Sequence, residues 1–349
     1  MNKKTFAIIQ QITSYITNVQ FVIAIVGFIL TIPHLLILTR KSMRSSSTNS
    51  IMTGIAILDL VVLLEVVLEH VYYFWIYDNP CINHSNYNFE LFLWIGDFLK
   101  DTGERASFWM GVFLVLIRLL ITKFKTAQRL SGYFFGYAVF TLTFIINVLI
   151  SYYFYSKFYL QAWMVPWQPG KRCSEFPKGY SENLYVRTIQ DQASYMAVFG
   201  NYSIIGGMSK ILISVLYPVL AVFLIFDIRK SAKHASTANS KKAAKERYHT
   251  GRMILLMAVL YTITSAPGGI SKFITLYCKV PDGSILMLLI GYGSIFLSAL
   301  FCLNSASHCL INFSMSTNYR KAAKMVFFAN RKQSSTSVLS VNLHLEFKL

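Results

Sequence analysis

Charged side chains are concentrated in one apolar stretch of the sequence, residues 90–124. The charged residues in this stretch include Asp97, Lys100, Asp101, Glu104, Arg105 and Arg118. Because a charge at the middle of a bilayer costs roughly 2.5–3.5 kcal/mol, these side chains are disfavoured against lipid. At about 100° per residue of a helix, a single polar stripe is made by Asp97, Lys100, Glu104, Ser107, Gly111 and Arg118. We expect this stripe to face other helices or a water-filled cavity.

The stripe admits two interpretations. Opposite charges three or four residues apart on a helix can pair, in which case the stripe only holds helices together. Alternatively, its outer part forms a ligand pocket in which carboxylates bind an amine and Lys100 binds a carboxylate or carbonyl. The predicted ligand-pocket residues are Asp97, Lys100, Asp101, Glu104, Glu65, Glu69 and His70. On this interpretation Arg118, at the inner end of the stripe, belongs to a switch.

The elements that position these residues are membrane-spanning helices. The chain is 54% hydrophobic and 14% charged, and its apolar runs reach the ~20 residues that a bilayer requires. We expect an all-α membrane protein, a seven-transmembrane helix bundle with spans at residues 20–39, 50–76, 91–122, 131–155, 203–228, 253–276 and 284–312. The net charge of +18 does not indicate nucleic acid, because the basic residues lie in short connections between spans.

Lysine and arginine residues predict the orientation. The connections on one side of the membrane hold 20 of them and those on the other side hold 8, and the richer side is cytoplasmic by the positive-inside rule. We therefore expect a multi-pass plasma-membrane protein in contact with the lipid bilayer. Its predicted parts are an extracellular N-terminus (1–19), the seven-transmembrane bundle (20–312), a short cytoplasmic amphipathic eighth helix (313–330) and a cytoplasmic tail (331–349).

Three further residues of the spans stand out. Asp59 lies deep in the second span without a cation near it in the sequence, and such a carboxylate needs a partner, a proton or a bound cation. It is either a structural hydrogen-bonding group or part of a functional site. Pro218 and Pro267 lie in the middle of the fifth and sixth spans. They are predicted hinges, because proline removes a helical hydrogen bond, although many membrane prolines are simply tolerated.

The predicted outer connections contain sites for covalent modification. Cys81 and Cys173 lie on the oxidising side and most simply form a disulfide, with Cys278 as a weaker alternative. Asn83 and Asn201 match the acceptor pattern for N-glycosylation. The sequence shows no metal-ligand cluster, nucleophile–base pair or phosphate loop, so we do not expect an enzyme.

Several segments resemble a known receptor family. These segments are LTRKSMRSSSTNSI, GIAILD, ERASFWMGVFLVLIR and LNSASHCLINFSMSTNYRK. Together with the order of the spans and both prolines, they resemble the nematode serpentine receptor class W family of rhodopsin-like G-protein-coupled receptors, over residues 20–330. That family is similar to invertebrate receptors for FMRFamide-type neuropeptides. The resemblance implies a heterotrimeric G protein and an extracellular ligand as partners.

The resemblance also implies roles for single residues. Arg118 stands at the arginine of the Asp-Arg-Tyr motif and Asn312 ends the segment at the Asn-Pro-x-x-Tyr motif, which implies G-protein coupling at both. A central polar site that can bind a sodium ion is implied at Asp59, Ser107, Asn304, Ser305 and His308. Ile117 replaces the acid before the arginine, and Ser265 stands where a tryptophan is usual. These departures imply an inactive state that is either looser or differently held.

The expected function is that of a receptor for an extracellular ligand. We favour a peptide, because the outer pocket mixes acids, bases and aromatic residues, and the resemblance implies a neuropeptide of the FMRFamide type. A small water-soluble environmental cue, detected in chemosensation, is the alternative ligand. Secondary transport would also place charges inside a bundle, but the odd number of spans and the lack of sequence repeats disfavour it.

Overall fold

The computed structural model describes residues 3–327, except residues 45, 78, 234–237, 279–283 and 316. Within this part of the chain, seven helices are long and apolar enough to cross a membrane. They are α1 (Lys3–Leu38), α2 (Ser47–Val71, continued by the π-helical turn η1, Tyr72–Tyr77), α3 (Tyr87–Lys123), α4 (Tyr133–Tyr155), α5 (Gln192–Lys233), α6 (Ala238–Tyr277) and α7 (Ile285–Met315). A 3-10 helix, η2 (Lys125–Ser131), joins α3 to α4. The predicted seven-helix membrane bundle is therefore confirmed.

Three helices begin well before the predicted spans. α1 begins at Lys3 rather than residue 20, α5 at Gln192 rather than 203, and α6 at Ala238 rather than 253. Hydropathy locates the apolar part of a span, whereas a helix continues beyond it until unfavourable residues end it. Residues 3–19 contain neither glycine nor proline. The segment predicted as an N-terminal extension is therefore the first part of α1.

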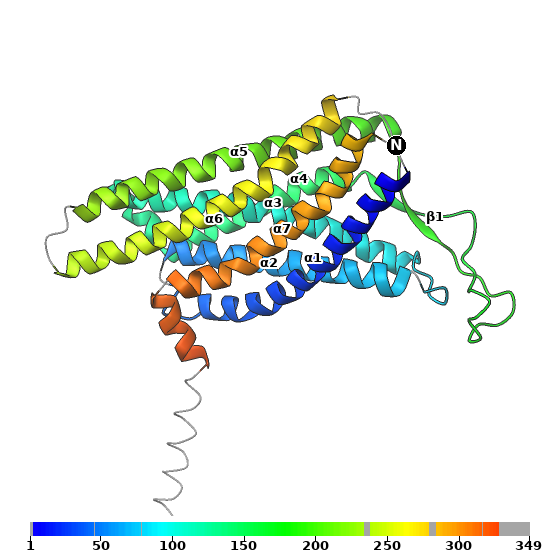
Figure 1. Ribbon diagram of the computed structural model, residues 1–349, viewed down its shortest axis with the longest axis horizontal. Coiled ribbons are helices and arrows are strands. Elements are labelled where there is room, and N and C mark those ends of the chain that lie inside the picture. The colour runs from blue at the N-terminus through cyan, green and yellow to red at the C-terminus, as the bar shows by residue number, and fades with distance from the viewer. Residues whose placement is uncertain are drawn as a thin grey trace, which may run out of the picture.

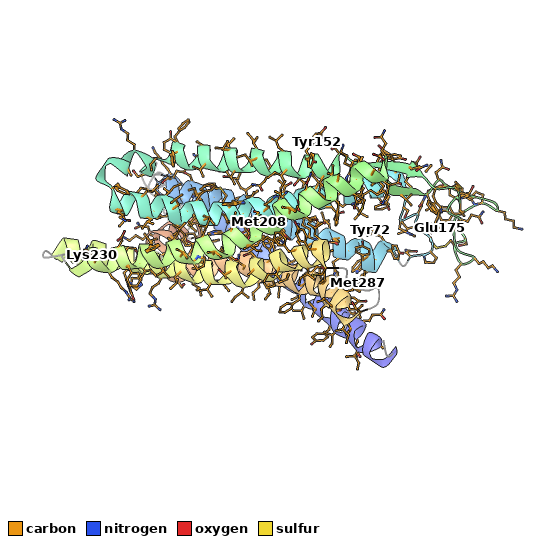
Figure 2. The ribbon with its side chains drawn as sticks, turned by 90° about the horizontal axis from the view of Figure 1, so that it is seen from above. Tyr72, Tyr152, Glu175, Met208, Lys230 and Met287 are labelled. Atoms are coloured by element: carbon orange, nitrogen blue, oxygen red, sulfur yellow. A yellow bond between two sulfur atoms is a disulfide. The ribbon has the colours of Figure 1, made fainter. Side chains whose placement is uncertain are left out.

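The helices lie side by side along one long axis, and the two ends of the bundle differ (Figure 1). One end, here called the hairpin end, carries an antiparallel sheet of β1 (Phe158–Ala162) and β2 (Tyr185–Ile189). The other end, called the opposite end, carries the joined tips of α5 and α6. Glu175 and Lys230 mark the two ends in Figure 2. The sequence analysis predicted no strand in the connection that forms the sheet.

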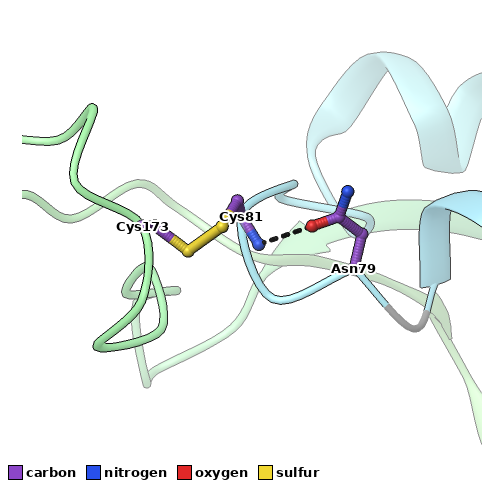
Figure 3. The surroundings of a disulfide bond; sticks show 3 residues. All are labelled: Asn79, Cys81 and Cys173. Atoms are coloured by element: carbon purple, nitrogen blue, oxygen red, sulfur yellow. Dashed lines mark hydrogen bonds between the residues drawn. A yellow bond between two sulfur atoms is a disulfide. The ribbon is translucent and has the colours of Figure 1, made fainter.

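A disulfide ties the hairpin to the connection between α2 and α3. Cys81 in that connection is bonded to Cys173 in the segment between β1 and β2 (Figure 3). The Asn79 side-chain oxygen accepts a hydrogen bond from the Cys81 amide at 3.0 Å and stabilises the turn that presents the cysteine. The predicted pairing is present, and the alternative partner, Cys278, is a free and exposed thiol.

Helix starts and close helix contacts follow from individual residues. The Ser46 hydroxyl caps α2 by accepting a hydrogen bond from Asn49 N at 3.3 Å, and the Asn86 side chain caps α3 in the same way. α4 approaches α2 at Gly136, where a Cβ atom would lie 2.4 Å from the Ser47 carbonyl oxygen. Since only glycine fits there, this residue sets the distance between the two helices.

The main apolar core lies toward the opposite end of the bundle. Its fully buried members include Ile51, Leu114, Tyr217, Leu224 and Ile254, from α2, α3, α5 and α6. Many other large apolar side chains are exposed on the outer faces of the helices, as expected where the surrounding solvent is lipid. The core packs against the half of α3 that lies toward the opposite end. The charged side chains in the other half of α3 lie near the hairpin end, outside this core.

Pro218 and Pro267 lie inside α5 and α6. Pro218 has no N–H group for the Ser214 carbonyl, and the Thr262 hydroxyl of α6 lies 3.3 Å from that oxygen. Thr262 Oγ1 also lies 2.9 Å from the Ala258 carbonyl oxygen, so one hydrogen is shared between two acceptors. The proline of α5 is therefore linked to α6, while the hinge role of both prolines stays a prediction.

A short helix over residues 317–327 follows α7 and turns away from the bundle axis (Figure 1). Tyr319 and Ala323 are buried, and the Tyr319 hydroxyl is hydrogen-bonded to His34 of α1 at 2.8 Å. The predicted C-terminal helix is therefore present and attached to the bundle. The predicted tail, residues 331–349, lies outside the described residues.

Candidate functional site

A cavity of about 800 Å³ opens inside the hairpin-end half of the bundle. Residues of α1, α2, α3, α5, α6 and α7 line it, together with Phe154 at the end of α4. Phe108, Phe199 and Phe301 supply aromatic parts of its wall. Its acidic, basic and histidine lining residues are Glu69, His70, Lys100, Glu104, Lys210 and Lys272. The cavity therefore brings together Glu69, His70, Lys100 and Glu104 of the predicted ligand-pocket residues.

Lys100 extends from α3 to α2 and pairs with two carboxylates there. Its Nζ lies 3.1 Å from Glu65 Oε2 and in direct contact with Glu69 Oε2. When all three groups are ionised, this corner of the cavity carries one net negative charge. Glu65 is buried behind the wall and does not line the cavity. Lys100 is thus occupied by acids of the protein, although the sequence analysis proposed it for a ligand.

His70 and Glu104 meet the cavity in different ways. The His70 ring is stacked between Phe21, at 3.9 Å between ring centroids, and Phe74, at 4.2 Å, and so extends an aromatic wall. Glu104 lines the cavity from α3 and makes no ion pair with any cation in the described part of the chain. Its carboxylate is therefore available to a ligand.

The other two predicted pocket residues on α3, Asp97 and Asp101, lie away from this cavity. Asp97 Oδ2 binds the Arg187 guanidinium of β2 at 2.7 Å and so ties α3 to the hairpin. Asp101 Oδ2 binds Arg105, one helical turn along α3, at 2.8 Å. The charged residues of α3 therefore have partners on several sides of the helix, and only some of these charged residues face the cavity.

Asp101 and Arg105 form the centre of a buried polar cluster that joins α3, α4 and α5. Arg105 donates hydrogen bonds to Asn147 Oδ1 at 2.9 Å, to Ser151 Oγ at 2.6 Å and to the Tyr202 hydroxyl at 3.3 Å. The Tyr202 and Ser151 hydroxyls donate in turn to Asp101. Arg105 is 6% exposed, and its buried charge is compensated by a carboxylate and hydrogen bonds. We call Asp101, Arg105, Asn147, Ser151 and Tyr202 the Arg105 cluster.

The sequence analysis assigned no role to the α4 and α5 members of this cluster. The sequence does contain a pattern that could have indicated the α4 members. Polar residues occur at every fourth position of an apolar span, at Thr143, Asn147 and Ser151, and therefore share one helix face. All three are buried. Lys210 and Lys272 of the cavity wall were missed as well. Each is an isolated lysine in an apolar segment, and a helical pattern indicates no partner for it.

A second buried polar cluster surrounds Asp59, further toward the opposite end. Asp59 Oδ1 accepts a hydrogen bond from the Ser107 hydroxyl at 3.0 Å, and Oδ2 lies 2.8 Å from His308 Nδ1. The Tyr261 hydroxyl lies 3.3 Å from Ser107 Oγ, so α2, α3, α6 and α7 meet here. Asp59 is 1% exposed. We call Asp59, Ser107, Tyr261, Asn304, Ser305 and His308 the Asp59 cluster.

Polar atoms of the Asp59 cluster are incompletely paired. Among the described residues, Asn304 Oδ1 and Nδ2, Ser305 Oγ and His308 Nε2 are buried and have no hydrogen-bond partner. Groups of this kind can bind water or an ion. The two Asp59 carboxylate oxygens already contact Ser107 and His308, so a sodium ion would share them with these partners. Sodium binding at this cluster stays a prediction.

The predicted coupling residues lie toward the opposite end, away from the cavity. Arg118 is half-buried near the end of α3, and the preceding Ile117 is packed in the core. Asn312 is buried on α7, where its Nδ2 donates a hydrogen bond to the His308 carbonyl oxygen at 2.8 Å. Asn312 is thus connected through α7 to the Asp59 cluster.

The two predicted glycosylation sites differ in exposure. Asn83 is 5% exposed, and its Nδ2 donates to Glu182 Oε2 at 2.9 Å and to the Asn183 carbonyl oxygen at 3.2 Å. A glycan would replace one of these hydrogens, so the arrangement argues against modification of Asn83. Hydrogen bonds from Tyr180 and from Asn83 hold the pKa of the Glu182 carboxyl below its usual value. Asn201 is exposed on α5, and glycosylation of both residues stays a prediction.

Comparison with protein families gives a match over most of the chain. The sequence model of the family described as serpentine type 7TM GPCR chemoreceptor Srw matches residues 18–330. This range includes all the residues of the cavity wall except Thr17, and both buried clusters. No curated protein matches the chain.

Proposed function

The chain belongs to the Srw family of serpentine type 7TM GPCR chemoreceptors, and we propose that it is a plasma-membrane receptor with its hairpin end outside the cell. As a member of this family it is a receptor, not an enzyme, and its general partners are an extracellular ligand and a G protein. The proposed orientation is supported by the excess of lysine and arginine in the connections of the opposite end. The disulfide at the hairpin end also favours an oxidising, extracellular side.

The observation that carries the proposed ligand site is the cavity itself. Its volume of about 800 Å³ falls within the range of roughly 300–1,000 Å³ that is typical of small-molecule sites. It combines aromatic walls with a few charged groups, of which Glu104, Lys210 and Lys272 make no ion pair within the described residues. These properties favour a small water-soluble cue, as in chemosensation. One end of such a molecule would bind the charged groups of the cavity, and its other end would pack against the aromatic rings.

An FMRFamide-like neuropeptide is the second candidate ligand. The hairpin lies next to the hairpin-end part of α3, because Arg187 of β2 binds Asp97. A peptide whose terminal residues enter the cavity would therefore also contact the hairpin. Nucleotide exchange should be measured in membranes that contain the receptor and a G protein, against one library of secreted peptides and one of small cues. Solute flux without nucleotide exchange would contradict the receptor proposal and favour transport.

We propose that Arg118 contacts the G protein together with the basic residues of the connection at 229–252. A guanidinium near the cytoplasmic end of α3 can donate several hydrogen bonds to the carbonyl oxygens of an inserted helix. Arg118→Ala should abolish ligand-driven nucleotide exchange, while ligand binding and surface expression stay largely intact. Lys178→Ala, at an exposed lysine of the hairpin, is the matched control. Equal exchange in the Arg118 variant would remove this residue from the coupling mechanism.

A further inference from the structure

Two lysines of the cavity wall, Lys210 of α5 and Lys272 of α6, extend across each other's helices. A Cβ atom at Gly268 of α6 would lie 3.3 Å from Lys210 Nζ, and one at Gly206 of α5 would lie 2.6 Å from Lys272 Nζ. Each ammonium group therefore lies on the bare backbone of the other helix, and the two glycines provide the room. This reciprocal arrangement holds two cations at the same part of the wall.

Neither lysine has an acidic partner in the described part of the chain. No carboxylate oxygen lies within 4.0 Å of either ammonium nitrogen, and Lys272 Nζ instead lies 5.2 Å from the centroid of the Tyr202 ring. Glu104 lines the same region, and a void of about 10 Å³ lies among these groups, close to the space that one water molecule needs. Asp101 and Arg105 line this void as well, so three cations and two acids leave a net positive charge here.

The α2 side of the cavity has the opposite balance. Lys100 pairs there with Glu65 and Glu69, which leaves one net negative charge when all three groups are ionised. The cavity is therefore negative toward α2 and positive toward α5 and α6. Two like charges that are partly removed from water repel each other more strongly than they would in solvent. An anionic group placed between the two lysines would remove this repulsion.

We propose that the ligand of this cavity carries a carboxylate that binds between Lys210 and Lys272. The inference rests on the proposed function, because it takes this cavity as the ligand site. The apolar body of the ligand lies against Phe154, Phe199 and Phe301, which line the same cavity. A small organic acid and a peptide with a free C-terminus share this chemistry. A C-terminally amidated peptide has no carboxylate at its terminus.

Matched pairs of acids and amides test the proposal with the full-length receptor in lipid nanodiscs. The small probes are 3-phenylpropionate with 3-phenylpropionamide and N-acetyl-phenylalanine with its amide; the peptide probes are Phe-containing tripeptides with a free or an amidated C-terminus. Binding is measured by ligand-observed NMR. We expect at least one acid to bind at least about tenfold more tightly than its amide, because the acid forms a charge pair that is removed from water. Whether small acids or free-acid peptides show the larger preference identifies the source of the carboxylate.

Variants of the wall locate the effect. Lys210→Met and Lys272→Met should each remove most of the acid preference, and Gly206→Ala should weaken it because the new Cβ displaces Lys272 Nζ. Lys178→Gln, in the exposed hairpin loop, should leave it unchanged. Thermal unfolding of each variant shows whether it is folded, and the glycine variant retains both lysines. The proposal is wrong if no acid is preferred, or if the preference survives in both methionine variants.

Nucleotide exchange measured in parallel separates this proposal from the receptor function. An acid that binds at the lysines, when no ligand of either library drives exchange, would support the carboxylate site and overturn the proposed receptor function. Exchange driven only by neutral ligands, with unaltered potency in Lys210→Met and Lys272→Met, would support the receptor and overturn the carboxylate site.

Discussion

The Arg105 cluster and the Asp59 cluster are both built on α3, yet they differ in how completely their polar atoms are paired. The Arg105 guanidinium donates to four different side chains, and Asp101 accepts from three donors. In the Asp59 cluster the Asn304 amide and the Ser305 hydroxyl have no hydrogen-bond partner among the described residues. A satisfied buried network specifies one arrangement, whereas a partly satisfied one specifies it weakly.

This difference assigns different mechanical roles to the two halves of α3. The hairpin-end half is held by the Arg105 cluster and lies beside the cavity, so it provides a fixed surface for a ligand. The other half meets α6 and α7 through the Asp59 cluster, where a second arrangement can pair atoms that are unpaired here. A receptor needs both, because a ligand shifts an equilibrium only between states that it binds differently.

The largest expected effect comes from breaking the fixed half with Arg105→Met. Asp101 would stay buried without its cation, and the loss of one partner of a buried ion pair costs about 3–5 kcal/mol. We expect a much lower thermal unfolding temperature and reduced surface expression. The double variant Arg105→Met/Asp101→Leu removes both charges and should recover part of the loss. A single variant as stable as the wild type would show that the cluster does not fix this half.

Gly111→Ala tests the boundary between the halves. The new Cβ atom would lie 2.8 Å from a ring carbon of Tyr217, and overpacking of this kind costs about 1–3 kcal/mol. The unfolding temperature should fall. Gly291→Ala is the control, since a Cβ atom there meets nothing within 4 Å and alanine favours a helix over glycine. Equal effects of the two substitutions would mean that the Tyr217 contact is not tight.

Asp59→Asn tests the adjustable half with little change of volume. The amide can keep one hydrogen bond to Ser107, so we expect only about 1 kcal/mol of destabilisation. Without the carboxylate, however, His308 is held less strongly, and α7 should leave the arrangement described here more often. Basal nucleotide exchange should therefore change several-fold while the unfolding temperature changes little. Titration with sodium belongs in the same assay, and basal exchange of the Asp59→Asn variant should respond to sodium less than that of the wild type. A large loss of stability without altered exchange would assign Asp59 a purely structural role.

The smallest expected effect is that of Thr262→Val. This substitution removes the hydroxyl that donates to the Ser214 carbonyl, which has no N–H partner at Pro218. Interhelical hydrogen bonds in membranes contribute about 0.6 kcal/mol on average, so stability should hardly change. If Pro218 is a hinge, the freed Ser214 carbonyl should become more mobile, and hydrogen exchange of the amides around Pro218 should rise. Unaltered exchange there would argue against a link between the proline and α6.

The sequence predicts the fold better than it predicts the site, for a physical reason. In lipid each span must satisfy its backbone polar groups by hydrogen bonds within its own helix and present apolar side chains, so the seven helices are visible as local apolar runs. The disulfide follows from the side of the membrane and the small number of cysteines. The ends of α1, α5 and α6 do not follow, because hydropathy is silent about a helix that continues into water.

The site depends on contacts between distant segments. A helical wheel places Asp97, Lys100 and Glu104 on one stripe, but these residues have different partners. Asp97 pairs with a residue of β2 and Lys100 with residues of α2, whereas Glu104 pairs with no cation in the described part of the chain. The hairpin that presents Arg187 was not predicted at all, because strand pairing across a long connection has no local pattern. Lys210 and Lys272 meet only because α5 and α6 pack together, with a glycine on each helix at the point of contact.

The disulfide between Cys81 and Cys173 has a consequence for biosynthesis. The two cysteines are 92 residues apart, and both α3 and α4 lie between them in the chain. With the hairpin end outside the cell, as proposed, the bond can close only after these two helices have been inserted and the segment beyond β1 has been translocated. Until then α2 and α3 are in the nascent chain without the disulfide that joins their connection to the hairpin. An oxidoreductase that forms this bond must therefore act on a chain whose first four spans are already in the membrane.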